Sequence, residues 1–233
     1  MPDTPTSETA KPHYAGHRAR LRERFLKSKG ADLADYELIE LLLFAAMPRR
    51  DVKPVAKALL ARFGSFAGVM NADPAELQKV GGVGETAAVS LMAVRQAAER
   101  LLQDDVMNQP VLGNWQSLMD YLRVAMGRNK TEQFRVLFLN RKNVLIVDEL
   151  QQEGTVDHTP VYPREVIKRA LDLGASALIL AHNHPSGDPK PSQADIEMTR
   201  ELQAAGEKLG IQLHDHVVVS RSGTTSFKTL GLL

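Results

Sequence analysis

The stretch LILAHNHPSGDPKPSQAD, residues 178–195, joins an apolar strand to a helix through a loop rich in proline and glycine. The strand begins a little earlier, because ASALILAH over 175–182 is apolar on both faces, as in a central, fully covered strand. Ser192 is a good N-cap and predicts that the helix begins there. This order places the polar side chains of the loop at the carboxyl end of a strand, where open α/β sheets usually bind ligands.

The segments around this stretch alternate between helix and strand. Asn114 precedes a predicted helix over 114–126, and a polar turn at Asn140–Asn143 separates two apolar segments. Pro163 near the start and Gly174 after the end mark another helix. The predicted strands are FRVLFLN (134–140), NVLIVDEL (143–150), ASALILAH and LHDHVVVS (213–220). We therefore expect an α/β (α+β) fold, with helices packed on a mixed sheet.

The N-terminal part has a different character. Residues 1–15 are rich in proline and threonine and are expected to be a disordered tail. Residues 16–104 show helical periodicity and begin with a basic segment, GHRARLRERFLKSKG. One interpretation of this segment is the solvated face of an amphipathic helix with Leu21 and Phe25 inside, and the alternative is a contribution to phosphate binding. A polar stretch with proline and glycine near residue 105 predicts the boundary to a second domain over 105–233.

Composition restricts the function classes. The 233 residues carry a net charge of +1, which gives no whole-chain signal for nucleic acid. No cysteine is present, so disulfides are excluded and a metal site would need histidine, carboxylate or backbone ligands. No apolar run is long enough to span a bilayer, and the N-terminus lacks the apolar core of a secretory signal. We expect a cytoplasmic protein without membrane contact.

Three residues of the 178–195 stretch form a candidate metal site. His182 and His184 are two apart on a strand, so their imidazoles face the same side. Asp195 begins an apolar helical stripe that continues through Met198 and Leu202, and a carboxylate on such a stripe needs a cation or several donors. Two histidines and one carboxylate leave a fourth position open for water, which is the pattern of catalytic zinc. We expect one Zn²⁺ per chain.

Each of these features also has an ordinary explanation. Ser192 and Asp195 resemble a capping box with Asp in the place of Glu, and a single histidine on an apolar strand is usually a hydrogen-bonded core residue. Two histidines in register beside a buried-face Asp favour a metal instead. The adjacent letters His-Asn-His at 182–184 do not indicate an HNH nuclease, whose motif is dispersed over separate elements.

His-x-His-Pro, six residues, then Ser-x-x-Asp resembles the signature of the JAMM (MPN+) zinc metalloproteases. The fuller string PREVIKRAL…LILAHNHPSGDPKPSQADIEMT…LHDHVVVS resembles the RadC-like branch of that superfamily, and the similarity extends from Gly16 to Leu233. The resemblance implies a peptidase or isopeptidase that uses a zinc-activated water, with Ser192 helping to hold the tetrahedral oxyanion. The C-terminal segment GTTSFKTLGLL departs from the pattern, since threonines replace an expected aromatic residue.

The resemblance also implies a catalytic glutamate on an earlier strand, and Glu132 in KTEQFRVLFLN holds that position. Glu132 shares strand parity with Phe134, so it begins the face that enters the core. The alternative is a solvated glutamate at a strand start, and the other candidates are Glu149, Glu153 and Glu165. His214, Asp215 and His216 are expected near the site, as second-shell or core residues, and a second metal there is a weaker alternative.

The segment ELQKVGGVGETAAVSLMAVRQAAERL, residues 76–101, resembles a helix-hairpin-helix, a module that in other families binds DNA phosphates without reading sequence. Gly82 and Gly84 let the backbone approach a phosphate at a helix start, and Lys79 and the basic 18–29 segment add positive charge. The alternative is a plain helical hairpin with a tight glycine turn.

Three functions follow from these patterns. The first is a zinc metallopeptidase acting on an unidentified peptide or protein. The second is a DNA repair or recombination accessory protein that binds DNA without sequence preference, with a structural or vestigial metal site. The third combines them, with the helical domain delivering the hydrolase to DNA-bound partners. Loss of zinc and activity on changing His184 would support the first, and salt-dependent DNA binding lost on changing Gly82 and Gly84 would support the second.

Overall fold

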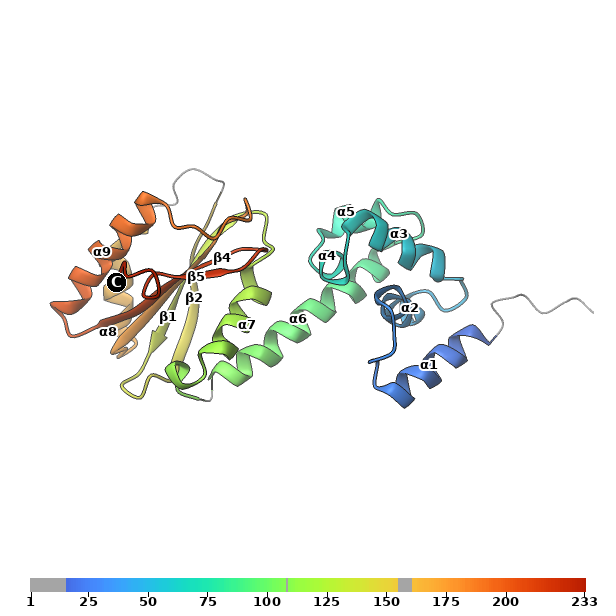
Figure 1. Ribbon diagram of the computed structural model, residues 1–233, viewed down its shortest axis with the longest axis horizontal. Coiled ribbons are helices and arrows are strands. Elements are labelled where there is room, and N and C mark those ends of the chain that lie inside the picture. Colours follow the sequence, from blue (N-terminus) through green and yellow to red (C-terminus); the bar gives the residue numbers. More distant parts are fainter. Residues whose placement is uncertain (1–15, 108, 155–160) are drawn as a thin grey trace, which may run out of the picture. The chain divides into compact units, whose positions relative to one another are not determined.

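The protein is described by a computed structural model, which covers residues 16–107, 109–154 and 161–233. The predicted tail at 1–15 lies outside the described residues. The chain forms two compact units, residues 1–95 and 96–233 (Figure 1). The division falls inside a long helix, α6 (Glu85–Met107), which is continuous through residue 105.

The N-terminal unit is helical, as predicted. Its described helices are α1 (His17–Ser28), α2 (Asp35–Ala46), α3 (Lys53–Phe63), α4 (Phe66–Met70), α5 (Pro74–Gln78) and the first part of α6. Local signals define their ends: Gly64 stops α3 with a φ of 80°, and the side chain of Asp73 caps α5. The apolar faces of these helices meet in one core, whose most buried members include Ile39, Leu43, Leu59, Leu77 and Leu91.

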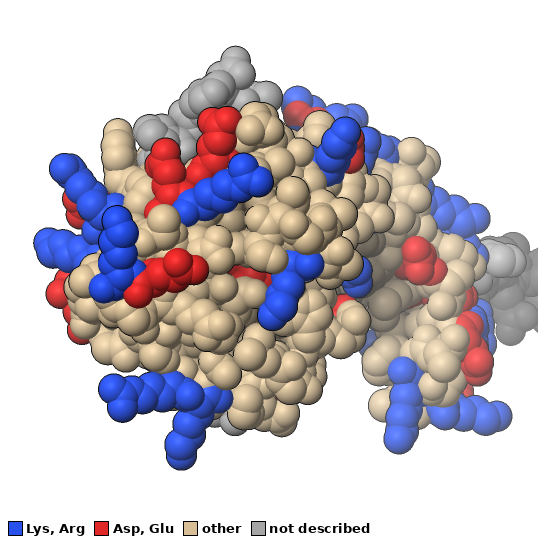
Figure 2. All heavy atoms as spheres, turned by 60° about the vertical axis from the view of Figure 1, so that its left-hand side comes forward, with Lys and Arg blue, Asp and Glu red and all other residues tan. Residues whose placement is uncertain are grey.

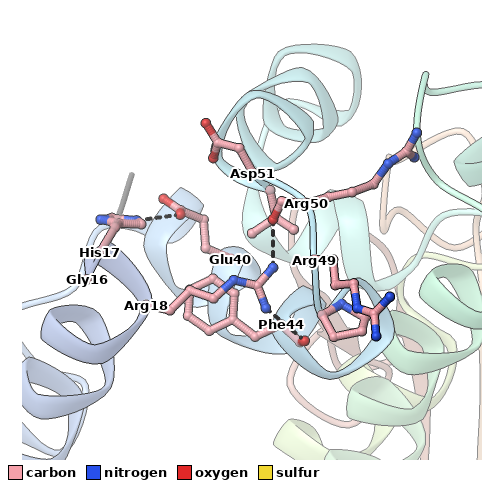
Figure 3. Close-up of a pocket in the computed structure, with 10 residues that line it drawn as sticks. Gly16, His17, Arg18, Glu40, Phe44, Arg49, Arg50 and Asp51 are labelled. Atoms are coloured by element: carbon pink, nitrogen blue, oxygen red, sulfur yellow. Dashed lines mark hydrogen bonds and ion pairs between the residues drawn. The ribbon is translucent and has the colours of Figure 1, made fainter. Parts of the chain in front are cut away.

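The basic segment at the start of this unit is partly structural. Arg18 lies over the ring of Phe44 and donates hydrogen bonds to three backbone carbonyl oxygens around the end of α2 (Figure 3). Arg24 forms an ion pair with Glu37. Leu21 is buried as expected, but Phe25 is 37% exposed, so that part of the prediction was wrong. Leu101, near the end of α6, is 69% exposed.

The C-terminal unit packs helices on a mixed sheet, which confirms the predicted α+β class. Its elements are the 3₁₀ turn η1 (Val111–Gly113), α7 (Trp115–Met126), β1 (Glu132–Leu139), β2 (Leu145–Gly154), α8 (Pro163–Asp172), β3 (Ala177–Asn183), α9 (Gln193–Glu207), β4 (Gln212–Val219) and β5 (Thr224–Ser226). In the described part of the chain the sheet has five strands in the order β2-β1-β3-β4-β5. Only β3 and β4 run parallel, because α9 connects them as a crossover.

Helices cover both faces of the sheet, α7 on one face and α8 with α9 on the other (Figure 1). The central strand β3 is buried along its whole length, as its apolar sequence predicts. Its residues alternate between the two cores: Ile179 and Ala181 pack with α7, while Leu178 and Leu180 face α8 and α9. His182 continues the second series, so it lies on the side of the sheet that α9 covers.

Strand pairing brings distant residues to one end of the sheet. β1 runs antiparallel to β3 and pairs Phe134 with His182, so the start of β1 lies beside the end of β3. An irregularity in the β3–β4 ladder leaves His214 without a partner and pairs Leu180 with His216. This extra residue shifts the alternation of β4, and His216 thereby shares the face of His182. No helix among the described residues has the length and apolar character that a membrane crossing requires.

Candidate metal centre

His182 and His184 present two ring nitrogens to the same point. β3 ends at Asn183, so His184 lies just beyond it, and its backbone N–H donates to the carbonyl of Val219 on β4. The Nε2 atoms of the two rings are 3.0 Å apart. The Nδ1 of His184 lies 2.8 Å from the carbonyl oxygen of Asp188. A carbonyl only accepts, so Nδ1 carries the proton and Nε2 of His184 keeps a free lone pair.

Asp195 lies against both rings. Its Oδ1 is 3.4 Å from Nε2 of His182, and its Oδ2 is 3.7 Å from Nε2 of His184. Ser192 and Asp195 also form the predicted capping box of α9: the backbone N–H and the hydroxyl of Ser192 each donate to Oδ2 at 2.7 Å. The carboxylate of Asp195 therefore caps α9 and also lies against the imidazoles. These contacts connect the end of the β3–α9 loop to its beginning at His182 and His184.

The charges at this point are strongly coupled. Burial raises the pKa of Asp195, but the close approach of the two imidazoles, which attract the carboxylate when they are protonated, and the hydrogen bond from Ser192 outweigh it and hold that pKa far below its usual range. The nearby carboxylate of Asp195 raises the pKa of His184, against the opposing effect of burial. The site thus stabilises positive charge between the rings and the carboxylate. That preference suits a bound cation as well as it suits a proton.

Glu132, the first residue of β1, also lies close to the two imidazoles. One carboxylate oxygen of Glu132 and one ring nitrogen each of His182 and His184 all lie within 4.8 Å of one another. The register explains this proximity, since Phe134 pairs with His182 and two residues earlier on β1 corresponds to two residues later in the antiparallel partner. Two carboxylates, those of Asp195 and Glu132, therefore lie close to the pair of imidazoles.

The other candidate glutamates have different partners. Glu149 forms an ion pair with Arg169 of α8, and Glu153 accepts hydrogen bonds from Thr131 and Gln133. Glu165 lies next to Arg164 with a side chain that is 56% exposed, as expected for a helix start.

The histidines of β4 separate into different environments. His216 is fully buried between the rings of Phe134 and Phe227, and its Nε2 lies 2.7 Å from Nδ1 of His182. Burial lowers the pKa of His216, which keeps the ring neutral. His214 instead points to Asn143, with 2.7 Å between Nε2 and the amide oxygen. The sequence alone did not separate these two, because the ladder irregularity at His214 has no clear local signal.

The donor set at the end of β3 fits zinc. Zn²⁺ takes imidazole nitrogen and carboxylate oxygen, and in catalytic sites three protein ligands leave one position open. Here two Nε2 atoms and the carboxylate of Asp195 converge, and a second carboxylate, that of Glu132, lies within reach. The ligand assignment itself stays a prediction.

The positively charged side chains beside the glycine turn of the N-terminal unit are Arg49 and Arg50, and Lys79, which was expected there, is paired with an acid. Lys79 pairs with Glu76, which also binds Arg62. Gly82, with a φ of +94°, and Gly84 line a hollow of about 530 Å³ together with Arg49 and Arg50 of the loop between α2 and α3. Figure 3 shows these two arginines projecting from that loop. No motif in the sequence points to Arg49 and Arg50 as candidate phosphate contacts.

The surface charges of the C-terminal unit are mixed. On the face that Figure 2 shows, Lys and Arg side chains stand among Asp and Glu and are separated by wide uncharged areas. This face therefore has no extended basic patch of the kind that nucleic acids select.

Comparisons with known proteins match both units. Residues 112–232 match the family model described as RadC-like JAB domain, and residues 15–89 match the model described as UPF0758 N-terminal. A protein of Rhodobacter capsulatus named UPF0758 protein is 59% identical over 213 residues, which cover 91% of this chain and all of that protein.

Proposed function

Since the chain belongs to the family of proteins with a RadC-like JAB domain, we propose that its C-terminal unit is a zinc-dependent hydrolase of amide bonds, a peptidase or isopeptidase. The observation that carries the proposal is the approach of two imidazole nitrogens to 3.0 Å with one carboxylate, that of Asp195, against both. Two ring nitrogens so close to each other and to a carboxylate favour positive charge between them, which a proton or a metal ion supplies.

His182, His184 and Asp195 would hold the zinc. When bound, zinc polarises a carbonyl oxygen and lowers the pKa of water to roughly 7. The chain's own side chains divide the remaining work. Glu132, close to both imidazoles, takes the proton of the attacking water and later delivers it to the leaving amine. The site lies at the start of β1, the end of β3 and the start of α9, so these elements hold Glu132, His182 and Asp195, while His184 lies one residue beyond β3.

Ser192 has a second proposed role. Its hydroxyl donates to Asp195 at 2.7 Å and accepts from the backbone N–H of Asp195 at 3.1 Å. The side chain is at the exposed edge of the site, where a substrate carbonyl would enter. Stabilising the oxyanion of the tetrahedral intermediate requires the hydroxyl proton to turn from Asp195 toward the substrate.

Metal content tests the proposal directly. Purified protein supplied with zinc is expected to hold about one zinc per chain by mass spectrometry, and His184→Ala is expected to lose it. His214→Ala is the matched control, because His214 contacts Asn143 instead of the site, and it should keep the metal. Equal zinc in wild type and His184→Ala, or none in the wild type, would contradict the proposed site.

Hydrolysis is then assayed on internally quenched peptide libraries and on lysine-isopeptide-linked peptides. Zinc-loaded wild type should cleave members of one set, and removal of zinc by a chelator should stop the cleavage reversibly. Cleavage that persists in the zinc-free protein would contradict the proposed mechanism. The two probe sets distinguish peptidase from isopeptidase action.

A second candidate function concerns the N-terminal unit. We propose that it binds nucleic-acid backbone phosphate at the hollow between Gly82, Gly84 and the two arginines at 49 and 50. The backbone N–H groups of a glycine turn before a long helix favour an anion. The guanidinium groups of Arg49 and Arg50 supply positive charge there, whereas Lys79 is already paired with Glu76. This function is compatible with the first, because it uses residues of the N-terminal unit alone.

A further inference from the structure

A chain of three hydrogen bonds connects the start of α9 to the metal centre. The hydroxyl of Thr199 lies 2.5 Å from the backbone carbonyl oxygen of Asp195. The same hydroxyl oxygen lies 2.6 Å from Nδ1 of His216, and Nε2 of His216 lies 2.7 Å from Nδ1 of His182. Thr199 and His216 are both fully buried, so water does not complete or interrupt the chain.

The direction of each bond follows from its donors and acceptors. A carbonyl oxygen only accepts, so the Thr199 hydroxyl proton points to Asp195. The hydroxyl oxygen must then accept from His216, which places the proton of that ring on Nδ1. A buried neutral imidazole carries one proton, so Nε2 of His216 accepts, and His182 donates from its own Nδ1. The remaining nitrogen of His182, Nε2, is left with a bare lone pair that faces His184 and Asp195.

We propose that Thr199 and His216 are positioning residues that hold His182 in its Nδ1–H tautomer, so that Nε2 is ready to bind the metal. The inference rests on the proposed function, because it assigns a purpose to this tautomer. Neither residue touches the metal position in the structure. Their effect passes through His182, as groups around metal-bound histidines generally act.

The position of His182 inside the sheet explains why a side chain, and not a backbone carbonyl, accepts the hydrogen bond from its Nδ1. His184 lies beyond β3 and uses a loop carbonyl, that of Asp188, to orient its ring. His182 lies inside β3, which pairs with β1 on one side and β4 on the other, so the nearby carbonyls already belong to the sheet. A side-chain acceptor must therefore come from the neighbouring strand. His216 supplies it, held between Phe134 and Phe227 in the core.

Thr199 offers a matched pair of variants. Thr199→Val keeps the shape but removes the hydroxyl, so His216 loses the acceptor that orders its proton. Zinc affinity, measured by competition with a chromophoric chelator, is expected to fall about 10–100-fold. Thr199→Ser keeps the hydroxyl and is expected to retain affinity close to the wild type. Equal affinity for Val and Ser would overturn the proposal.

His216 offers a second pair. His216→Leu removes the acceptor for His182, whereas His216→Gln places an amide oxygen near the position of Nε2. We expect weak zinc binding for Leu and partial recovery for Gln. If Gln binds zinc no better than Leu, although amide spectra show that both variants are folded, the hydrogen bond does not have the proposed role.

Nitrogen-15 NMR of the imidazole rings measures the tautomer itself. In zinc-free wild type the proton of His182 is expected on Nδ1, and in Thr199→Val an Nε2–H form should appear. A merely structural role of Thr199 would leave this tautomer unchanged. A wild-type His182 with its proton on Nε2 would overturn the inference even if no variant folded. Absence of zinc binding by the wild type would contradict the proposed function, while the NMR result would still decide the tautomer.

Discussion

At the scale of single residues, the centre depends on two carboxylates with different surroundings. Asp195 accepts two hydrogen bonds from Ser192 and lies within 3.4 Å of a ring nitrogen, so it is held in place as a ligand would be. Glu132 begins β1 and lies near the two imidazoles, and no described residue gives it a capping hydrogen bond such as Ser192 gives Asp195. A proton-transfer group must lie within reach of the reacting atoms, and Glu132 meets that requirement.

Replacing Glu132 distinguishes a base from a ligand. Glu132→Gln keeps size and polarity but cannot take a proton, so we expect zinc content near the wild type and hydrolysis reduced by about 10²–10⁴-fold. Glu165→Gln, at an exposed glutamate paired with Arg164, is the control and should change neither. Zinc content by mass spectrometry and rates on the cleaved quenched peptide are measured together. Loss of zinc in Glu132→Gln would identify Glu132 as a ligand instead.

At the scale of elements, the start of α9 has a structural and a functional role at once. The capping box satisfies backbone N–H groups that a helix start leaves without partners, and it also aims Asp195 at the imidazoles. The adjoining strand β3 contributes rigidity, because it is buried along its whole length between two paired strands. A loop alone would hold these ligands less accurately than a strand end and a helix start do.

The cap of α9 predicts a measurable stability effect. Ser192→Ala removes the side-chain acceptor and is expected to lower the free energy of unfolding of the C-terminal unit by about 1 kcal/mol. Ser192→Asn keeps an N-cap acceptor and should recover most of that loss. Hydrogen exchange of the β3 amides in zinc-free protein reports the opening of this unit specifically. Identical exchange in wild type and Ser192→Ala would show that the cap contributes nothing.

At the scale of the whole molecule, the two units have separate cores and separate candidate functions. The buried cluster of the N-terminal unit consists of residues between Leu21 and Leu91, and both clusters of the C-terminal unit lie beyond residue 100. The net charge of +1 is too small to drive association with nucleic acid as a whole. Any such binding must therefore come from a local site, and the hollow beside the glycine turn is the candidate.

The two functions should be separable by mutation. Arg49→Gln combined with Arg50→Gln is expected to weaken binding to double-stranded DNA and to lower the slope of its salt dependence by about 2, since each lost phosphate contact lowers it by about 1. Arg22→Gln with Lys27→Gln removes equal charge from exposed positions of α1 and is the control. Fluorescence anisotropy at several salt concentrations measures both, and zinc content should stay unchanged. Equal losses in the two double variants would indicate a general charge effect and contradict the proposed site.

The sequence by itself determined the features that depend on neighbours along the chain. His182 near the end of β3 and His184 just beyond it are two apart in an extended segment and present their rings to one side, and Ser192 with Asp195 form a capping box across one helical turn. The alternation of apolar strands and helices likewise predicted the α+β class. These patterns are local because strand and helix geometry repeats every few residues.

Only the tertiary structure decided which distant residues join His182, His184 and Asp195 in the site. Glu132 reaches the site because β1 pairs with β3 in one particular register, and His216 does so because an irregularity at His214 changes the alternation of β4. A shift of one residue in either ladder would turn these side chains to the opposite face. Register depends on the packing of the whole sheet, so no local pattern specifies it. The same holds for Arg49 and Arg50, which only folding brings beside the glycine turn.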